Sequence, residues 1–375
     1  MNFQVDKEIL IKSLSIADSI ISSKNVHTLL SNCLFNVSLD EIEIVSSDNE
    51  IGVRTRLKSS SESEMSFAIN PKKLLGIVKE LPKGDVLVEV MENYSIVIRS
   101  RNLKGHYSLI GTSRGDYPEL PDFDEENSIE IDQSLLKDII RKVIYAASND
   151  NIKPVFNGLY LLSESSERIT AVASDSKRLT LFSAKLDSPM NISKGTIIPL
   201  KTIHEISRLL SNTGKCRLLL AKNQCFFRIN ETDIVSRVID GQFPNYKQVI
   251  PQDRKFEISI QTEKLRDSLR RVMVFAREPS YKVMLNFSKD SLLIEVKTSE
   301  LGEAEEEIQI ESNRDESISI AISAQYLLDA IKEVDSFSVV FGMTTPISPV
   351  LICPEGNDNH ISVIMPIQSK SPQGD

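Results

Sequence analysis

The chain has 375 residues, a formal net charge of −9 and 41% apolar residues. That length suits two or three domains, and the apolar fraction excludes a disordered chain. No run of about 18 uncharged apolar residues occurs, so we expect no membrane span. The N-terminus lacks the apolar core of a signal peptide, which predicts a cytoplasmic protein. Four cysteines are too few for a disulfide framework and are expected to be reduced core thiols.

A short strand that runs straight into an amphipathic helix recurs three times along the chain. Its copies begin near residues 3, 129 and 258, so the repeat is 126 and then 129 residues long. Within each copy the pattern returns after 62 to 67 residues. We therefore expect six half-repeats, each of a strand, a helix and further strands. The predicted helices cover residues 7–21, 70–83, 132–147, 199–211, 261–277 and 323–335.

Local signals support these helices. In the second one, Leu74, Val78 and Leu81 recur at the spacing of one helix face. Asn70 is suited to cap this helix, and Pro71 to be its first residue. Ser323 is the corresponding N-cap of the sixth helix.

Alternating apolar residues predict paired strands between the helices. These runs cover residues 86–90, 96–98, 218–220, 226–229, 338–341 and 350–352. Polar, proline-containing linkers are expected at 121–127 and 251–255. The predicted domains are therefore 1–124, 125–252 and 253–375, and the last includes a short polar tail, 367–375.

Positive charge is concentrated on the predicted helices. They sum to +6, so the remaining segments carry −15. In the fifth helix, Arg266, Arg270 and Arg277 are predicted to share a face away from the apolar stripe. A single such helix is usually just a solvated surface. Several helices biased in the same direction favour a polyanion held by its phosphates, without reading of bases.

Signals for catalysis are weak. The sequence has no glycine-rich nucleotide loop, and its four histidines lie in different half-repeats without a second ligand at metal spacing. Residues 174–177 include nucleophile and base types but lack the glycine pattern of a nucleophile elbow. The acidic run 303–307 is interpreted as a solvated strand edge rather than a cation site. We therefore expect a non-catalytic protein with no cofactor and no metal.

Three stretches carry a resemblance to a known family. They are 173–179 (ASDSKRL), 240–246 (DGQFPNY) and 363–366 (VIMP). Together with three internally duplicated units over the whole chain, they resemble the bacterial DNA sliding clamp, the beta subunit of DNA polymerase III. The resemblance implies an α+β fold of three tandem clamp domains, with helices lining a ring and antiparallel sheets outside.

The function implied by the resemblance is that of a ring-shaped processivity factor. Two chains joined head to tail would encircle duplex DNA and slide along it. Twelve helices packed about 10 Å apart leave a bore near 28 Å, whereas six leave only about 9 Å. The implied partners are duplex DNA, the DNA polymerase III catalytic subunit, the clamp loader, and other replication and repair proteins with clamp-binding peptides. A nucleoid-associated cytoplasmic location follows, with no membrane partner.

The resemblance and the charge pattern assign site residues. By resemblance Lys24 and either Lys72 or Lys73 face DNA; by charge pattern alone so do Lys79, Arg141 and Arg270. The dimer contact would bury Tyr107 and Leu109 against Val274 and Phe275. The implied partner-peptide groove has 13 members: Phe156, Ser174, Ser176, Lys177, Arg178, Leu179, Pro244, Gln248, Val249, Pro349, Val363, Met365 and Pro366.

Some positions depart from the family pattern. Ser176 and Lys177 stand where Gly and His are common, and Gln248 where a basic residue often occurs, which leaves peptide affinity open. The chain also continues beyond Pro366. Two alternatives remain at this point. One is a protein-binding scaffold of clamp-like fold that does not encircle DNA. The other is a six-bladed propeller-like enzyme or lectin, which would need about four strands per repeat and no helix.

Overall fold

The computed structural model describes residues 1–21, 28–150, 152–187, 195–298 and 300–368. They form two compact units, Met1–Ser134 with His204–Val238 and Leu135–Ile203 with Ile239–Asp375. Helices form at all six predicted places: α1 (Lys7–Ile20), α2 (Pro71–Glu80), α3 (Gln133–Ile144), α4 (Leu200–Leu209), α5 (Thr262–Val272) and α6 (Ala324–Lys332). The propeller alternative is therefore wrong.

The predicted helix caps are confirmed. The Asn70 side chain accepts a hydrogen bond from the Lys73 backbone N–H at 3.0 Å, and Ser323 caps α6 in the same way. The predicted end of the fifth helix is wrong, because α5 ends at Val272 and tighter turns follow it. Arg277 thus lies beyond the helix, where it pairs with Glu300.

The first unit contains two antiparallel sheets. The five-stranded sheet has the order β5 (Ser60–Ser61), β1 (Asn2–Asp6), β7 (Asp85–Val90), β8 (Ser95–Ser100), β9 (Tyr107–Ile110). The nine-stranded sheet has the order β10 (Thr112–Ser113), β6 (Met65–Ile69), β2 (Cys33–Val37), β3 (Glu41–Ser47), β4 (Ile51–Lys58), β18 (Thr232–Arg237), β17 (Gln224–Ile229), β16 (Lys215–Leu220), β11 (Ile129–Asp132). The β4–β18 pair joins the predicted first and second domains within one sheet.

The second unit also contains two antiparallel sheets. Its nine-stranded sheet has the order β15 (Thr196–Pro199), β12 (Gly158–Ser165), β13 (Arg168–Ser174), β14 (Arg178–Lys185), β27 (His360–Ile364), β26 (Val350–Pro354), β25 (Ser338–Met343), β19 (Phe256–Gln261), β23 (Glu311–Ser312). The four-stranded sheet has the order β22 (Gly302–Gln309), β21 (Ser291–Thr298), β20 (Lys282–Phe287), β24 (Ile318–Ser323). The acidic run 303–307 lies in β22, which is an edge strand as predicted.

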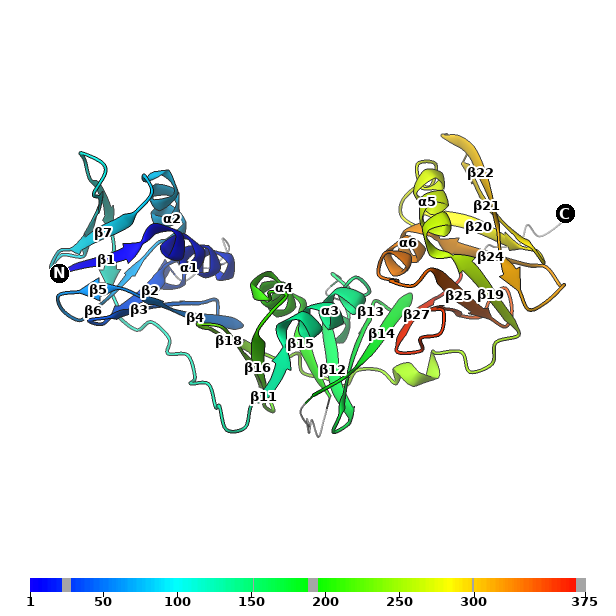
Figure 1. Cartoon of the computed structure of the whole chain (residues 1–375), viewed down its shortest axis with the longest axis horizontal. Helices are drawn as coiled ribbons and strands as arrows, with labels where there is room; N and C mark the ends of the chain where they lie inside the picture. Colours follow the sequence, from blue (N-terminus) through cyan, green and yellow to red (C-terminus); the bar gives the residue numbers. More distant parts are fainter. Residues whose placement is uncertain (22–27, 151, 188–194, 299, 369–375) are drawn as a thin grey trace. The chain divides into compact units, whose positions relative to one another are not determined.

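Helix pairs pack on these sheets. α1 packs against α2 in the first unit, and α5 against α6 in the second (Figure 1). Lys7 links the first pair, since its buried Nζ donates to the carbonyl oxygens of Lys79 and Leu81 at 3.0 and 2.6 Å. A cation at the carbonyl end of a helix is favourable, which explains a buried lysine at this position.

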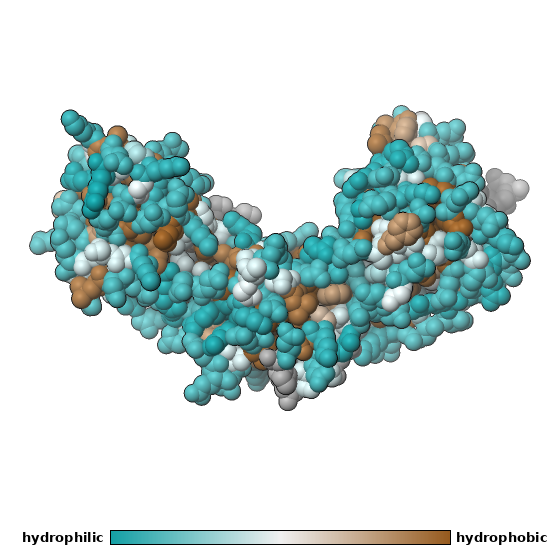
Figure 2. Space-filling view, in the orientation of Figure 1, coloured by the Kyte–Doolittle hydropathy of each residue, from teal (hydrophilic) through white to brown (hydrophobic). Residues whose placement is uncertain are grey.

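Apolar side chains from the helices and sheets form the cores. The apolar faces of α1 and α2 meet β1–β8 residues, and those of α5 and α6 meet residues of β19–β27. The four cysteines are buried and unpaired, as predicted, and burial raises the pKa of both Cys216 and Cys225 to about 12. The face shown in Figure 2 is mainly hydrophilic, with hydrophobic patches scattered over it. No helix in the described part of the chain is long and apolar enough to cross a membrane.

The domain limits at residues 124 and 252 stay predictions. Both predicted linkers contain a turn or bends but neither helix nor strand. Sheet pairing nevertheless continues from one predicted domain to the next, at β4–β18 and at β14–β27. Each junction is therefore built from main-chain hydrogen bonds as well as from side chains.

Candidate functional site

A tight turn between β13 and β14 borders the candidate groove. The Ser174 hydroxyl donates to the Arg178 carbonyl at 2.8 Å, and the Asp175 carboxylate accepts from the backbone N–H groups of Lys177 and Arg178. Ser176 has a φ of +76°, the left-handed region that favours glycine. This conformation gives a physical reason why glycine would be common at this position.

The floor of the groove is the junction of β14 and β27. These strands pair with Leu179 opposite Val363. Just beyond the end of β27, the Met365 N–H donates to the Lys177 carbonyl at 2.8 Å, so the pairing of the two segments continues past the strand. Residues about 185 positions apart in the sequence thus supply one apolar surface.

Residues 240–249 form the wall of the groove. Gly241 has a φ of +135°, and a methyl group there would lie 2.8 Å from Val155, so this position requires glycine. The ring of Phe243 stacks on Tyr160 at 4.7 Å between centroids and meets the edge of Phe156 at 6.0 Å. These rings fix the segment against the second unit's sheet.

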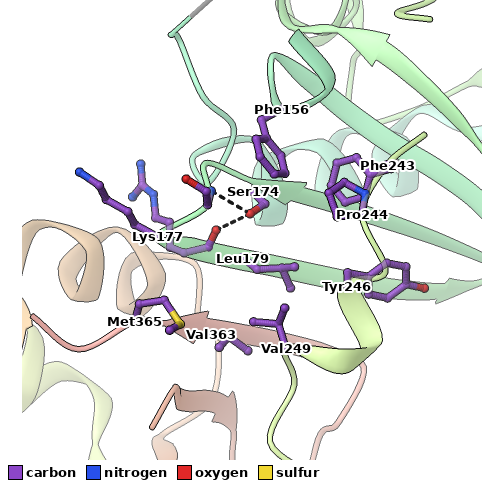
Figure 3. A pocket seen from close by; sticks show the side chains of 12 residues that line it. Phe156, Ser174, Lys177, Leu179, Phe243, Pro244, Tyr246, Val249, Val363 and Met365 are labelled. Carbon is purple, nitrogen blue, oxygen red and sulfur yellow. Dashed lines mark hydrogen bonds between the residues drawn. The ribbon is translucent and has the colours of Figure 1, made fainter. Parts of the chain in front are cut away.

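The resulting cavity has a volume of about 110 Å³. Leu179, Val249 and Val363 lie near one another at its centre, and Phe156 and Pro244 lie to one side (Figure 3). Its lining is mainly apolar, with a polar border from the turn. Because typical sites for drug-sized ligands measure about 300–1,000 Å³, this cavity suits one or two apolar side chains of a peptide.

The structure brings together ten of the thirteen residues that the resemblance assigned to the groove. The ten are Phe156, Ser174, Ser176, Lys177, Arg178, Leu179, Pro244, Val249, Val363 and Met365. Gln248, Pro349 and Pro366 do not line the cavity. Phe243 and Tyr246 line it although they were not assigned to it. Both belong to the 240–246 motif. Two aromatic residues close to a proline in an otherwise polar segment could have indicated that they line the groove.

Arg178 is held by its own chain. Its guanidinium donates to Asp175 at 3.0 Å and to Asp329 at 2.8 Å, and lies over the Tyr326 ring at 4.3 Å. The Arg178 side chain is only 12% exposed. This arginine therefore connects the groove to α6, and most of its guanidinium is bound within the chain.

Three of the lysines expected to face DNA lie exposed on α2. Lys72 and Lys73 are exposed in the first turn of α2, and Lys79 is exposed in its last turn. Arg270 on α5 is exposed and lies 3.5 Å from the Asp267 carboxylate. Lys24 lies outside the described residues. The assignment of all these residues to DNA remains a prediction.

Arg141 has a different environment from those lysines. It forms ion pairs with Asp138 at 2.6 Å, Glu333 at 2.5 Å and Asp335 at 3.2 Å. Burial raises the pKa of Glu333, and Arg141 opposes that effect. Three carboxylates thus compensate the charge of Arg141, so it links α3 to the end of α6 and offers less charge to a phosphate.

The edge strand β9 and the turns just after α5 carry the residues predicted for the subunit contact. β9 is an edge strand on which Tyr107 is 41% exposed and Ile110 is 90% exposed. Val274, just beyond α5, is 73% exposed. Leu109 and Phe275 are half-buried against the cores of their own units. Whether these surfaces meet between two chains remains a prediction.

Metal-ligating side chains do not gather in the structure. Among residues 1–21, 28–150, 152–187, 195–298 and 300–368, no three His, Cys, Asp or Glu side chains are placed to hold a metal ion.

Comparison with known proteins finds the same family along the whole chain. Family models described as the N-terminal, central and C-terminal domains of the DNA polymerase III beta subunit match residues 1–121, 130–245 and 247–368. The beta sliding clamp of Bacillus subtilis is 29% identical over 380 residues, covering 98% of this chain and 100% of the relative.

Solved structures show the same similarity. The crystal structure of a DNA polymerase sliding clamp from Bacillus subtilis superposes with a TM-score of 0.93, at 29% identity, covering 98% of this chain and 99% of the other. The DNA polymerase III beta subunit from Thermotoga maritima gives a TM-score of 0.89 at 25% identity, again with 98% and 99% coverage.

Proposed function

The chain belongs to the DNA polymerase III beta subunit family, and we propose that it is a ring-shaped processivity factor that encircles duplex DNA and slides along it. It tethers the replicative polymerase and other proteins to the template, and it is itself non-catalytic. The observation that carries this proposal is the match of all three clamp domains, in order, along one chain. As a DNA-bound ring it works in the cytoplasm, on the nucleoid.

The mechanism is topological. A closed ring stays on DNA even when each phosphate contact is weak, and weak contacts permit sliding. The exposed lysines of α2 support this role, because they offer charge to phosphates without base-reading geometry. An acidic body repels the backbone elsewhere, which favours a centred duplex.

The groove in the second unit supplies the tether. Its apolar lining would bury one or two side chains of a partner peptide, while the turn 174–178 offers polar groups at its border. The polymerase III catalytic subunit, the clamp loader and repair proteins would compete for this one groove. Ser176 keeps the turn that the groove needs, despite its departure from glycine.

The ring closes by a head-to-tail contact of two chains. β9 and β22 are both sheet edges with unpaired main-chain groups on one side. Pairing β9 of one chain with β22 of another would satisfy those groups and cover Ile110. Such a heterologous contact closes when the curvature suits two copies.

Loading on circular DNA tests encirclement. The protein is placed on nicked circular DNA by a clamp loader and washed at high salt, and the DNA is then cut once. We expect retention at high salt and loss after linearisation. Loss by salt alone would indicate ordinary electrostatic binding and contradict the proposal.

A further inference from the structure

The turn between β3 and β4 has the same hydrogen bonds as the turn that borders the groove. The Ser47 hydroxyl donates to the Ile51 carbonyl and accepts from the Asn49 N–H. The Asp48 carboxylate accepts from the N–H groups of Glu50 and Ile51. Residues 174–178 repeat every one of these bonds. Asn49 even has the φ of Ser176, +76°.

The strands that follow the two turns pair in the same register. β4 pairs with β18 so that Gly52 is opposite Val235. β14 pairs with β27 so that Leu179 is opposite Val363. In both cases the first of these residues is the second residue of its strand. The first unit therefore holds a second copy of the groove's frame, with Gly52 in place of Leu179.

A segment of the same chain fills this second copy. Leu120 packs beside Tyr117, Leu34 and Val45, and a methyl group at Gly52 would overlap its side chain. Phe123 meets the edge of Phe226 at 6.5 Å between centroids. The remaining cavity measures about 10 Å³, against about 110 Å³ in the open groove.

Polar contacts also hold the segment in place. Arg54 donates to the Asp122 carboxylate and to the Leu120 carbonyl, both at 3.0 Å. Arg228 lies over the Phe123 ring at 4.6 Å and also pairs with Glu125. These arginines therefore bind an acidic segment with one aliphatic and one aromatic side chain, three residues apart.

We propose that the β4–β18 junction is a second peptide groove, closed in the resting chain by Leu120 and Phe123, which takes a short partner peptide when these side chains leave. Their counterparts 126 residues later, Tyr246 and Val249, line the open groove instead of filling it. The proposal rests on the peptide-binding role proposed for that open groove.

The chemistry of the resting occupant defines the ligand. A peptide that replaces it carries a leucine-like residue, an aromatic residue three positions later, and carboxylates that reach Arg54 and Arg228. The closed junction thus explains why, of the two copies of the frame found among the described residues, only the β14–β27 copy is open.

A titration counts the sites. The probe is a synthetic octapeptide with the sequence of residues 118–125, measured by calorimetry against the full-length wild type and the variant Leu120→Ala/Phe123→Ala. We expect the variant to bind one more peptide per chain than the wild type. The control variant Leu39→Ala/Phe337→Ala also removes one leucine and one phenylalanine side chain, but from exposed positions. It should bind as many peptides per chain as the wild type. A peptide in which both apolar residues are alanine should not fill the extra site.

Equal stoichiometry in a variant that keeps the wild-type circular dichroism would overturn the proposal. If that variant fails to fold, Gly52→Leu provides a second test. The new leucine would stand where Leu179 stands in the open groove, and it should displace Leu120. Endoproteinase Glu-C should then cut after Glu119 at least tenfold faster than in the wild type. An unchanged rate would also contradict the proposal. Both tests work without DNA, so a failure of encirclement remains a separate result.

Discussion

Met365 lies at the border of the open groove and is 39% exposed. Its side chain adds apolar area to a bound peptide while contributing little to the core. We expect Met365→Ala to weaken binding of a polymerase-derived peptide about tenfold, or about 1.4 kcal/mol. Fluorescence anisotropy measures this change. Ile347→Ala, at a 71% exposed position, serves as the control, and equal affinities of the two variants would contradict the assignment.

His360 is a buried titratable group beside the β14–β27 junction. Its Nε2 lies 3.2 Å from the Lys142 carbonyl, and burial together with the Lys142 charge lowers its pKa to about 4, against the opposing effect of Asp335 and Asp138. Because the folded pKa is below the unfolded value of about 6.5, its contribution to stability is complete above pH 6.5. It is lost as the pH falls toward 4.

His360→Gln should therefore remove part of the acid sensitivity. Between pH 6.5 and 4.5 we expect the free energy of unfolding to fall about 2 kcal/mol less in this variant than in the wild type. Urea denaturation at both pH values gives this difference. The exposed His106 provides the matched control, and His106→Gln should follow the wild type. If His360→Gln keeps the wild-type pH dependence, the buried imidazole is not the source of the acid sensitivity.

At the scale of an element, α2 shows how a helix separates packing from charge. Leu74, Leu75 and Val78 are buried, whereas Lys72, Lys73 and Lys79 are exposed. Since α1 contacts α2 through the buried face, the lysine face stays open for solvent or phosphates. Substitution of these lysines should thus weaken DNA binding without changing the fold.

The triple variant Lys72→Ala/Lys73→Ala/Lys79→Ala tests this separation. We expect the slope of log affinity for linear duplex DNA against log salt to become shallower by about 2.7, because three phosphate contacts are removed and each contributes about 0.9. The melting temperature should stay within about 2 °C. Lys58→Ala/Lys185→Ala/Lys222→Ala removes the same charge from exposed strand and turn positions and should leave the slope nearly unchanged. Equal slopes of the two variants would contradict the α2 assignment.

For the whole molecule, the exposed sheet edges decide assembly. Ile110 is 90% exposed on β9, and an apolar residue on an open strand edge favours pairing with another chain. Ile110→Asp should therefore convert the proposed dimer to a monomer at micromolar concentration, as measured by light scattering after gel filtration. Leu39→Asp, at a 58% exposed position, should remain a dimer. If Ile110→Asp also remains a dimer, ring closure does not use this edge.

The sequence by itself determined the local structure and the family. Helix periodicity, the caps Asn70 and Ser323, and alternating strands all depend on neighbours within a few residues, so they were predictable. The 126-residue repeat indicated duplicated units, and three motifs supplied most of the groove through the resemblance.

Only the tertiary structure decided which distant groups meet. The pairing of β14 with β27 joins Leu179 to Val363, and no local pattern specifies such a register. Arg141 carried the same signal in the sequence as a free surface cation, yet three carboxylates compensate its charge. Leu120 likewise stands just before the predicted polar linker 121–127, and its role follows from the space that Gly52 leaves beside it. Local patterns specify elements, whereas contacts between distant elements specify sites.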